Sequence, residues 1–135
     1  MSLLRYLLDT NILSQLVNNP FGAISARIQS RGIDTVCTSV LVAAELRFGA
    51  AKSGSRRLGD RVDQVLSGVR VLPLDVPADR QYAALRSKLA RDGKLIGSTD
   101  LFIAAHALVL DLTLVTANVS EFARVYDLRI ENWLD

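Results

Sequence analysis

The 135-residue sequence has few of the residues that build disulfide scaffolds and soft-metal sites. It holds one cysteine, Cys37, and one histidine, His106. A single cysteine excludes an intramolecular disulfide and a cysteine-based zinc cluster. A single histidine, lying well inside a helical pattern, argues against histidine-rich zinc centres and Ser-His-Asp chemistry. We therefore expect both side chains to be packed, with Cys37 as an inert thiol in the apolar stretch TVCTS.

Long apolar runs are also missing. No run approaches the ~20 residues that a membrane span requires, and the apolar start at residues 3–8 is too short for a signal peptide. We therefore expect a cytoplasmic protein with no membrane partner. The composition, 50% hydrophobic and 22% charged, is typical of a globular chain, and residues 1–135 are predicted to form a single domain. The net charge of +2 permits a polyanionic partner without requiring one.

Short β-prone stretches alternate with helical patterns along the whole chain. This alternation predicts right-handed crossovers and a three-layer α/β/α sandwich with a central, mostly parallel sheet of about five strands. The predicted strands are 3–8, 35–38, 69–74, 112–116 and 128–130. Helices are predicted from Ile12, from Pro20 to Gly32, from Val40 towards Gly49, around 58–66, from Pro77 to Arg91, around 103–108 and around Phe122.

Three acidic residues are predicted to meet at one edge of this sheet, where the strands reach their carboxyl ends and ligands bind in such folds. Asp9 directly follows the first strand, and Asp100 lies in the first turn of a helix that Ser98 or Thr99 would cap. Glu45 lies six residues beyond Ser39, about 9 Å along its helix. Because helical side chains lean towards the N-terminus, we expect the long glutamate arm to reach back to this edge.

Polar residues around these acids are predicted to support a metal site. Carboxylates gathered within ~4 Å repel one another by about 4 kcal/mol per pair at an effective dielectric of 20, so a positive partner is needed. A set of oxygen donors favours Mg²⁺ or Mn²⁺ over zinc, and such a cation suits phosphodiester hydrolysis. The supporting candidates are Asn11, Thr116, Asn118 and Glu121, which lie next to Asp9 or at the end of the fourth strand.

Four stretches in order, LLDTNIL, SVLVAAELRFGA, LIGSTDLFIAAHA and LTLVTANVSEFARV followed by LRIENW, resemble the motifs of the PIN-domain ribonuclease toxins of the VapC family. The resemblance runs from Leu7 to Trp133. It implies that Asp9, Glu45 and Asp100 are an acidic triad that binds Mg²⁺ or Mn²⁺ and cuts RNA endonucleolytically. It also implies a supporting hydrogen bond from Thr116. Asn118 stands where relatives often carry a fourth acid, a loss for which Glu121 would compensate.

The same resemblance implies a set of partners. Such toxins form homodimers and are held inactive by a small antitoxin protein, commonly by a segment that lies across the acidic groove. DNA would be contacted only indirectly, through the antitoxin. The identity of the antitoxin and of the RNA does not follow from the resemblance.

Several alternatives stay open on the residues alone. Asp9 and Asp100 are each also explained as helix-terminal residues, and Glu45 as a solvated helix residue. A catalytically silent module that binds a metal or a basic peptide would use the same acids. A haloacid-dehalogenase-like phosphatase is disfavoured because its second aspartate would fall at Asn11, and DTNIL lacks the glycines of a phosphate-binding loop.

The basic residues that follow Glu45 have two interpretations. They form a solvated face, or they bind RNA phosphates without sequence preference. The RNA-binding candidates are Arg47, Lys52, Arg56 and Arg57. Phe48 is expected to pack in the core or contact the antitoxin rather than stack on a base. Tyr82, Leu85 and Leu89 belong either to the core or to a dimer surface.

Overall fold

The computed structural model describes residues 3–134, and a sheet of five parallel strands forms its centre. The order across the sheet is β3-β2-β1-β4-β5, so the first strand of the chain lies in the middle. The strands are β1 (Tyr6–Leu8), β2 (Val36–Ser39), β3 (Arg70–Leu72), β4 (Thr113–Val115) and β5 (Ile130–Glu131). The predicted sheet is confirmed, and every pairing in it is parallel.

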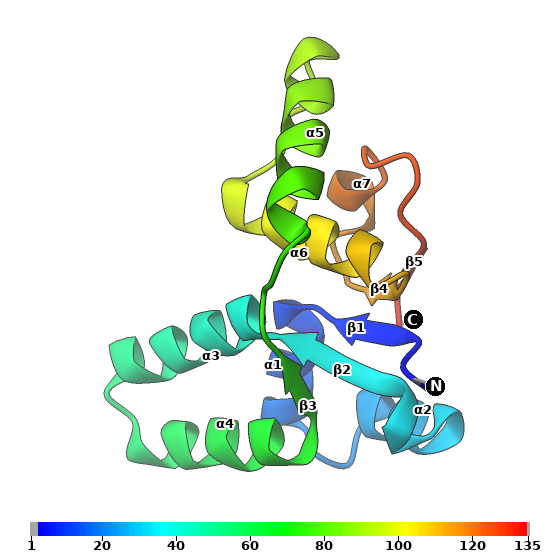
Figure 1. The fold of residues 1–135 in the computed structure, drawn as a ribbon. Helices are drawn as coiled ribbons and strands as arrows, with labels where there is room; N and C mark the ends of the chain where they lie inside the picture. Colours follow the sequence, from blue (N-terminus) through cyan, green and yellow to red (C-terminus); the bar gives the residue numbers. More distant parts are fainter. Residues whose placement is uncertain (1–2, 135) are drawn as a thin grey trace.

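Helices join each strand to the next. They are α1 (Thr10–Asn18), α2 (Ala23–Arg31), α3 (Val40–Ser53), α4 (Arg56–Gly68), α5 (Ala78–Arg91), α6 (Ser98–Val109) and α7 (Val119–Phe122). The chain first runs outward from β1 to β3 and then returns to β4 on the other side of β1. Right-handed crossovers therefore place α1 to α4 on one face of the sheet and α5 to α7 on the other. Figure 1 shows these two groups of helices apart from one another.

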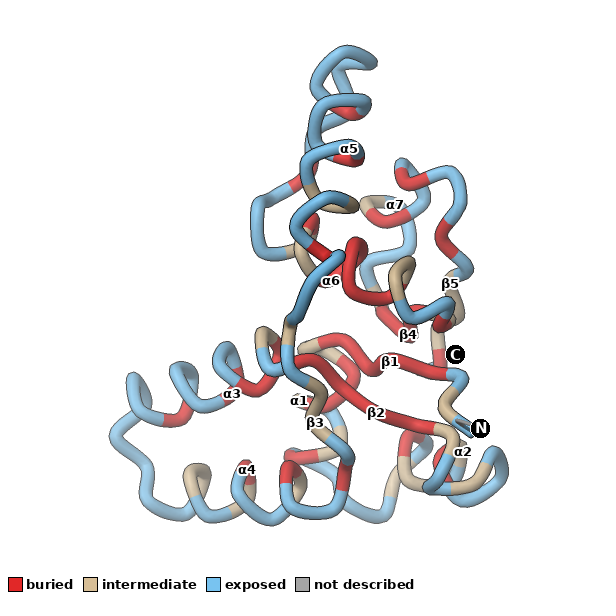
Figure 2. Tube along the Cα trace, in the orientation of Figure 1, coloured by how far each residue is buried: buried red, intermediate tan, exposed pale blue. Residues whose placement is uncertain are grey.

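The register of the central strands decides where the polar residues emerge. Leu8 pairs with Thr38 on one side and with Val115 on the other, and these three residues are buried. Figure 2 shows burial concentrated on β1 and β2. The residues that follow, Asp9 and Thr116, therefore leave the sheet side by side. The Asp9 backbone N–H donates to the Val115 carbonyl at 2.9 Å and extends the ladder by one step.

Helix boundaries differ from the sequence prediction in the middle of the chain. Helix α3 does not end at Gly49 but continues to Ser53, because Ala50, Ala51 and Lys52 are strong helix formers that carry it past one glycine. The helix ends at Gly54, whose left-handed conformation has φ 69°. Helix α4 then begins behind Ser55, whose hydroxyl accepts the Leu58 N–H at 3.1 Å.

Smaller differences concern other ends of elements. The last strand is β5 at Ile130–Glu131, later than predicted. Helix α2 begins at Ala23, later than the predicted Pro20, and it ends before Gly32, whose φ of 97° suits glycine. Helix α6 is capped by Gly97 and not by the predicted Ser98 or Thr99, and the Gly97 carbonyl accepts the Leu101 N–H at 2.9 Å. Asp100 still lies in the first turn of α6, as predicted.

Cys37 and His106 are packed, as predicted. Both are almost fully buried, and burial raises the pKa of the Cys37 thiol to about 12. Tyr82 is half-buried on α5, where its ring stacks on Phe102 of α6 with the ring centres 3.9 Å apart. Within residues 3–134 the helices are too short or too polar for any of them to cross a bilayer.

Candidate active site

Asp9 is the buried centre of the site, with 3% of its surface exposed at the end of the central strand. Its Oδ1 accepts the Thr10 backbone N–H at 2.8 Å, so the side chain caps α1. Its Oδ2 accepts a 2.8 Å hydrogen bond from Thr116 Oγ1 and lies 3.5 Å from Asn11 Nδ2. Capping α1 and facing the carboxyl edge of the sheet are therefore two properties of the same carboxylate.

Thr116 and Asn11 join the ends of β1 and β4. The Thr116 hydroxyl accepts the Asn118 backbone N–H at 3.0 Å while it donates to Asp9. Asn11 Oδ1 accepts the Ala117 backbone N–H at 3.0 Å. Asn118 thus contributes a backbone group here, and its side chain is exposed and makes no capping bond to α7.

Glu45 reaches back to this edge from the second turn of α3. Its Oε1 accepts a 2.7 Å hydrogen bond from the Thr10 hydroxyl, across 35 residues of chain. The expected reach along the helix is confirmed by this contact. Thr10 was missed by the sequence analysis, although a hydroxyl directly after Asp9 at the start of a helix was a usable signal. A hollow of about 320 Å³ adjoins this contact and is lined by both Thr10 and Glu45.

Asp100 and Glu121 come together from the other face of the sheet. The pKa of Asp100 is raised to about 7, first by burial and then by the charge of Glu121 and a hydrogen bond with it. The charges of Asp9 and Glu45 raise it further. A proton on Asp100 would lower the repulsion among the carboxylates. The predicted acids therefore act on one another electrostatically, including Glu121.

The pKa of Asp9 is raised as well. Burial is the largest cause, and the charges of Glu45 and Glu121 add to it. The hydrogen bonds from Thr116 and Thr10 work in the opposite direction, because they stabilise the ionised carboxylate. None of the ion pairs found among residues 3–134 includes any of these four acids. Their negative charge would therefore be offset by bound protons or by an added cation.

The donor chemistry of the site is that of a hard divalent cation. Among residues 3–134, the side chains that hydrogen-bond to Asp9 or Glu45 offer a hydroxyl or an amide, and none of them offers a thiol or an imidazole. Carboxylate oxygens are the usual ligands of Mg²⁺ and Mn²⁺. As the side chains stand, no group of three or more acidic, histidine or cysteine residues between positions 3 and 134 is arranged to hold a metal ion.

The basic candidates lie on and after α3. Arg47 forms an ion pair with Asp63 of α4, and both side chains are more than half exposed. Lys52, Arg56 and Arg57 are exposed around the turn between α3 and α4. Phe48 has 67% of its surface exposed, which corrects the expectation of core packing and leaves a partner contact or base stacking. Phe48 lies one turn after Glu45, on the exposed side of α3, whereas Leu46 lies on the buried side.

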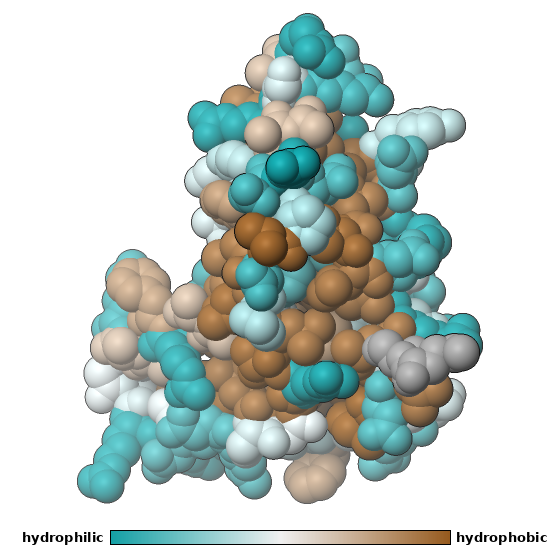
Figure 3. Space-filling model, in the orientation of Figure 1, coloured by the Kyte–Doolittle hydropathy of each residue, from teal (hydrophilic) through white to brown (hydrophobic). Residues whose placement is uncertain are grey.

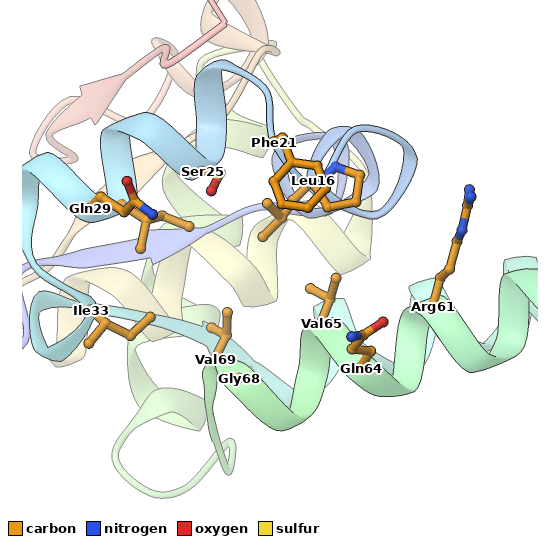
Figure 4. Close-up of a pocket in the computed structure, with 12 residues that line it drawn as sticks. Leu16, Phe21, Ser25, Gln29, Ile33, Arg61, Gln64, Val65, Gly68 and Val69 are labelled. Atoms are coloured by element: carbon orange, nitrogen blue, oxygen red, sulfur yellow. The ribbon is translucent and has the colours of Figure 1, made fainter.

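An apolar cavity lies apart from the acids. It has a volume of about 690 Å³ between α1, α2 and α4, and Figure 4 shows Leu16, Phe21 and Val65 among its lining side chains. Phe21 has 96% of its surface exposed. None of the candidate site residues lines this cavity.

Comparisons with known proteins identify relatives over almost the whole chain. The sequence profile of the PIN domain matches residues 6–128. "Ribonuclease VapC2" of Haemophilus influenzae strain Rd is 37% identical over 134 residues, covering 98% of this chain and 100% of that protein. "tRNA(fMet)-specific endonuclease VapC" of Shigella flexneri is 35% identical, covering 97% of this chain and 99% of that one.

A solved structure, VapBC2 from Rickettsia felis bound to a DNA fragment from their promoter, superimposes with a TM-score of 0.90 and 32% identity. The match covers 96% of this chain and 99% of that chain. With full-length likeness in both sequence and fold, the chain belongs to the VapC family of PIN-domain ribonucleases.

Proposed function

We propose that this chain is a divalent-metal-dependent endoribonuclease that acts as the toxin of a toxin–antitoxin pair, with residues 1–135 as one nuclease domain. The observation that carries the proposal is that Asp9, Glu45 and Asp100 act on one another electrostatically at the carboxyl edge of the sheet, with no ion pair to any of them among residues 3–134. PIN-domain nucleases generally depend on divalent metals, and a divalent cation would offset the negative charge of these acids.

The three acids would hold Mg²⁺, with Mn²⁺ as a substitute. When bound, the cation offsets charge on a phosphodiester and lowers the pKa of a water molecule. Thr116 orients Asp9 through its hydrogen bond and favours the ionised carboxylate against the effect of burial. Thr10 holds the Glu45 carboxylate, and Glu121 supplies the negative charge that Asn118 does not. Asn11 ties the start of α1 to the end of β4, which keeps Asp9 and Thr116 in register.

The exposed basic residues at the turn between α3 and α4 are proposed to contact RNA phosphates. Arg47 is partly neutralised by Asp63, so we expect Lys52, Arg56 and Arg57 to contribute more. Contacts of this kind supply affinity without reading sequence, and they weaken as salt increases. Because RNA is the substrate, the cytoplasm is the proposed place of action.

A small antitoxin and a second copy of the chain are the proposed protein partners. The DNA-bound VapBC2 complex from Rickettsia felis supports an antitoxin partner and contact of such a complex with DNA, and we propose that the antitoxin makes that contact. The cavity beside Phe21 is a proposed binding site for apolar side chains of the antitoxin, and it lies away from the acids. Figure 3 shows apolar surface across the middle of one face, over α6 and the strands, which suits a homodimer.

The test is cleavage of a tRNA pool that includes initiator tRNA, because the Shigella relative is named for that substrate. The purified chain is incubated with Mg²⁺, with Mn²⁺ and with EDTA. We expect cleavage by the wild type and by Asp34→Asn, a matched control at the opposite edge of the sheet, and none by Asp9→Asn or Asp100→Asn. Intact Mn²⁺ binding with no cleavage of any RNA would instead favour the catalytically silent module.

A further inference from the structure

A buried side-chain hydrogen bond links α3 and α6 beneath the acidic edge. His106 lies in the last turn of α6 with 2% of its surface exposed, and its Nδ1 is 3.0 Å from Ser39 Oγ. Ser39 is fully buried, ends β2 and caps α3 by accepting the Leu41 N–H at 3.1 Å. The function proposed above gives His106 no role.

The two ends of this bond have matching positions relative to the acids. Ser39 precedes Glu45 by six residues on α3, and His106 follows Asp100 by six residues on α6. Each end therefore lies about 9 Å along its own helix from the carboxylate-bearing residue. The bond therefore joins the helix that carries Glu45 to the helix that carries Asp100. Neither acid is itself a partner in the bond.

Counting protons favours Ser39 as the donor in this bond. The Ser39 oxygen already accepts the Leu41 N–H, and its own buried hydroxyl hydrogen needs an acceptor, which Nδ1 provides. The ring proton then lies on Nε2, which makes no hydrogen bond of good geometry among the described residues, and the Pro73 backbone is the one further group that interacts with the ring. Burial lowers the pKa of His106, and an interaction with the Pro73 backbone only partly opposes this, which agrees with a neutral ring.

An imidazole at this place does more than fill space. It accepts the Ser39 hydroxyl hydrogen and also interacts with the Pro73 backbone, whereas a leucine of similar bulk could do neither. We propose that His106 is a positioning residue: by accepting the Ser39 hydroxyl, it fixes α3 against α6 and so sets the separation of Glu45 and Asp100. The inference rests on the proposed function, because it concerns the same acids.

Three replacements at position 106 separate positioning from packing. His106→Asn can place an amide oxygen near the position of Nδ1, His106→Gln places its amide nearer to Nε2, and His106→Leu removes the acceptor. We expect His106→Leu and His106→Gln to lose about 10-fold in both RNA cleavage and Mn²⁺ affinity, as removal of outer supports of metal ligands does. His106→Asn should stay close to wild type in both. Mn²⁺ affinity is measured by calorimetry without RNA.

Nitrogen NMR provides a readout that does not depend on activity. Because the chain has one histidine, its ring signals are unambiguous, and we expect the Nε2–H tautomer with an Nδ1 signal that moves in Ser39→Ala. An unperturbed Nδ1 signal in Ser39→Ala would overturn the inference. So would wild-type cleavage and Mn²⁺ affinity in folded His106→Leu, or a loss in His106→Asn as large as in His106→Gln.

The outcomes also separate this inference from the proposed function. If the wild type neither binds Mn²⁺ nor cleaves RNA, the proposed function fails, and the positioning role fails with it, even where NMR still detects the bond. If the wild type is active and all His106 variants match it in RNA cleavage and Mn²⁺ affinity, only the inference fails. If His106→Leu does not fold, the comparison of the asparagine and glutamine variants decides the question.

Discussion

Thr116 donates a 2.8 Å hydrogen bond to Asp9 although the two residues are 107 positions apart in the chain. The parallel pairing of Leu8 with Val115 brings them together, because each is the first residue beyond its strand. Thr116 is fully buried, and its hydroxyl is held in turn by the Asn118 N–H. The carboxylate at the centre of the site thus depends on a hydroxyl from the neighbouring strand.

Replacing Thr116 by valine should therefore lower both stability and activity. The shape is kept, but buried Asp9 loses a hydrogen bond, which costs about 1–3 kcal/mol of unfolding free energy. RNA cleavage should fall about 10- to 100-fold, and Thr116→Ser should restore most of it. Thr113→Val, at the other end of β4, is the matched control. Urea unfolding and cleavage of the tRNA pool are measured, and equal activity of the two valine variants would contradict the expectation.

The length of the Glu45 side chain should matter as much as its charge. Glu45→Asp should lose nearly as much cleavage activity as Glu45→Ala, because the shorter arm cannot span the distance from α3 to Thr10. Initial cleavage rates in Mg²⁺ test this, with circular dichroism to confirm folding. Wild-type cleavage activity in Glu45→Asp would show that the length of this side chain does not limit catalysis.

The stability of the metal-free protein should depend on pH through Asp100. Its pKa is raised to about 7 in the folded protein, whereas an unfolded aspartate titrates near its ordinary value of 3.8. Between these values the folded state binds more protons than the unfolded state, so stability falls as pH rises from about 4 to about 7 and then levels off. Asp9, whose pKa is also raised, contributes with the same sign.

Thermal unfolding in EDTA from pH 4.5 to 8 measures this effect. We expect the melting temperature to fall with rising pH in the wild type and to fall much less in Asp100→Asn, which cannot ionise. Added Mn²⁺ should raise the melting temperature most at the high-pH end, where the carboxylates are ionised. A melting temperature that rises with pH across this range would contradict the assignment.

Neutralising the basic turn should weaken RNA binding in a salt-dependent way. Each lost phosphate contact lowers the slope of log affinity against log salt by about 0.7 for a single strand. Arg56→Gln/Arg57→Gln is compared with Arg5→Gln/Arg70→Gln, which removes the same charge at the amino edge of the strands. RNA binding is measured by fluorescence anisotropy, with all variants made in the Asp9→Asn protein so that the RNA is not cleaved. An unchanged slope in the first pair would assign Arg56 and Arg57 to a solvent role.

Much of the fold follows from the order of apolar stretches. Alternating patterns predict the parallel sheet, and the ends of the strands then place Asp9, Thr116 and Glu121 on one edge. The reach of Glu45 also follows from helix geometry. These predictions succeed because backbone periodicity and strand direction are local properties that a sequence carries directly.

Other features depend on contacts that no local pattern records. The bond of Thr10 to Glu45 requires knowledge of how α1 lies against α3, and the bond of His106 to Ser39 requires the packing of α6. Helix α3 passes Gly49 because neighbouring residues outweigh one weak helix former, a balance that a glycine alone does not reveal. Exposure of Phe48 depends on where α4 packs against α3.

The place of β1 in the middle of the sheet has a consequence for how such an enzyme is switched off. Asp9 is attached to a strand that is hydrogen-bonded on both sides, so displacing it means opening the centre of the molecule. An inhibitor that acted by displacing Asp9 would therefore have to unfold the central sheet. An inhibitor that must later release an intact enzyme is better served by covering the acids from outside.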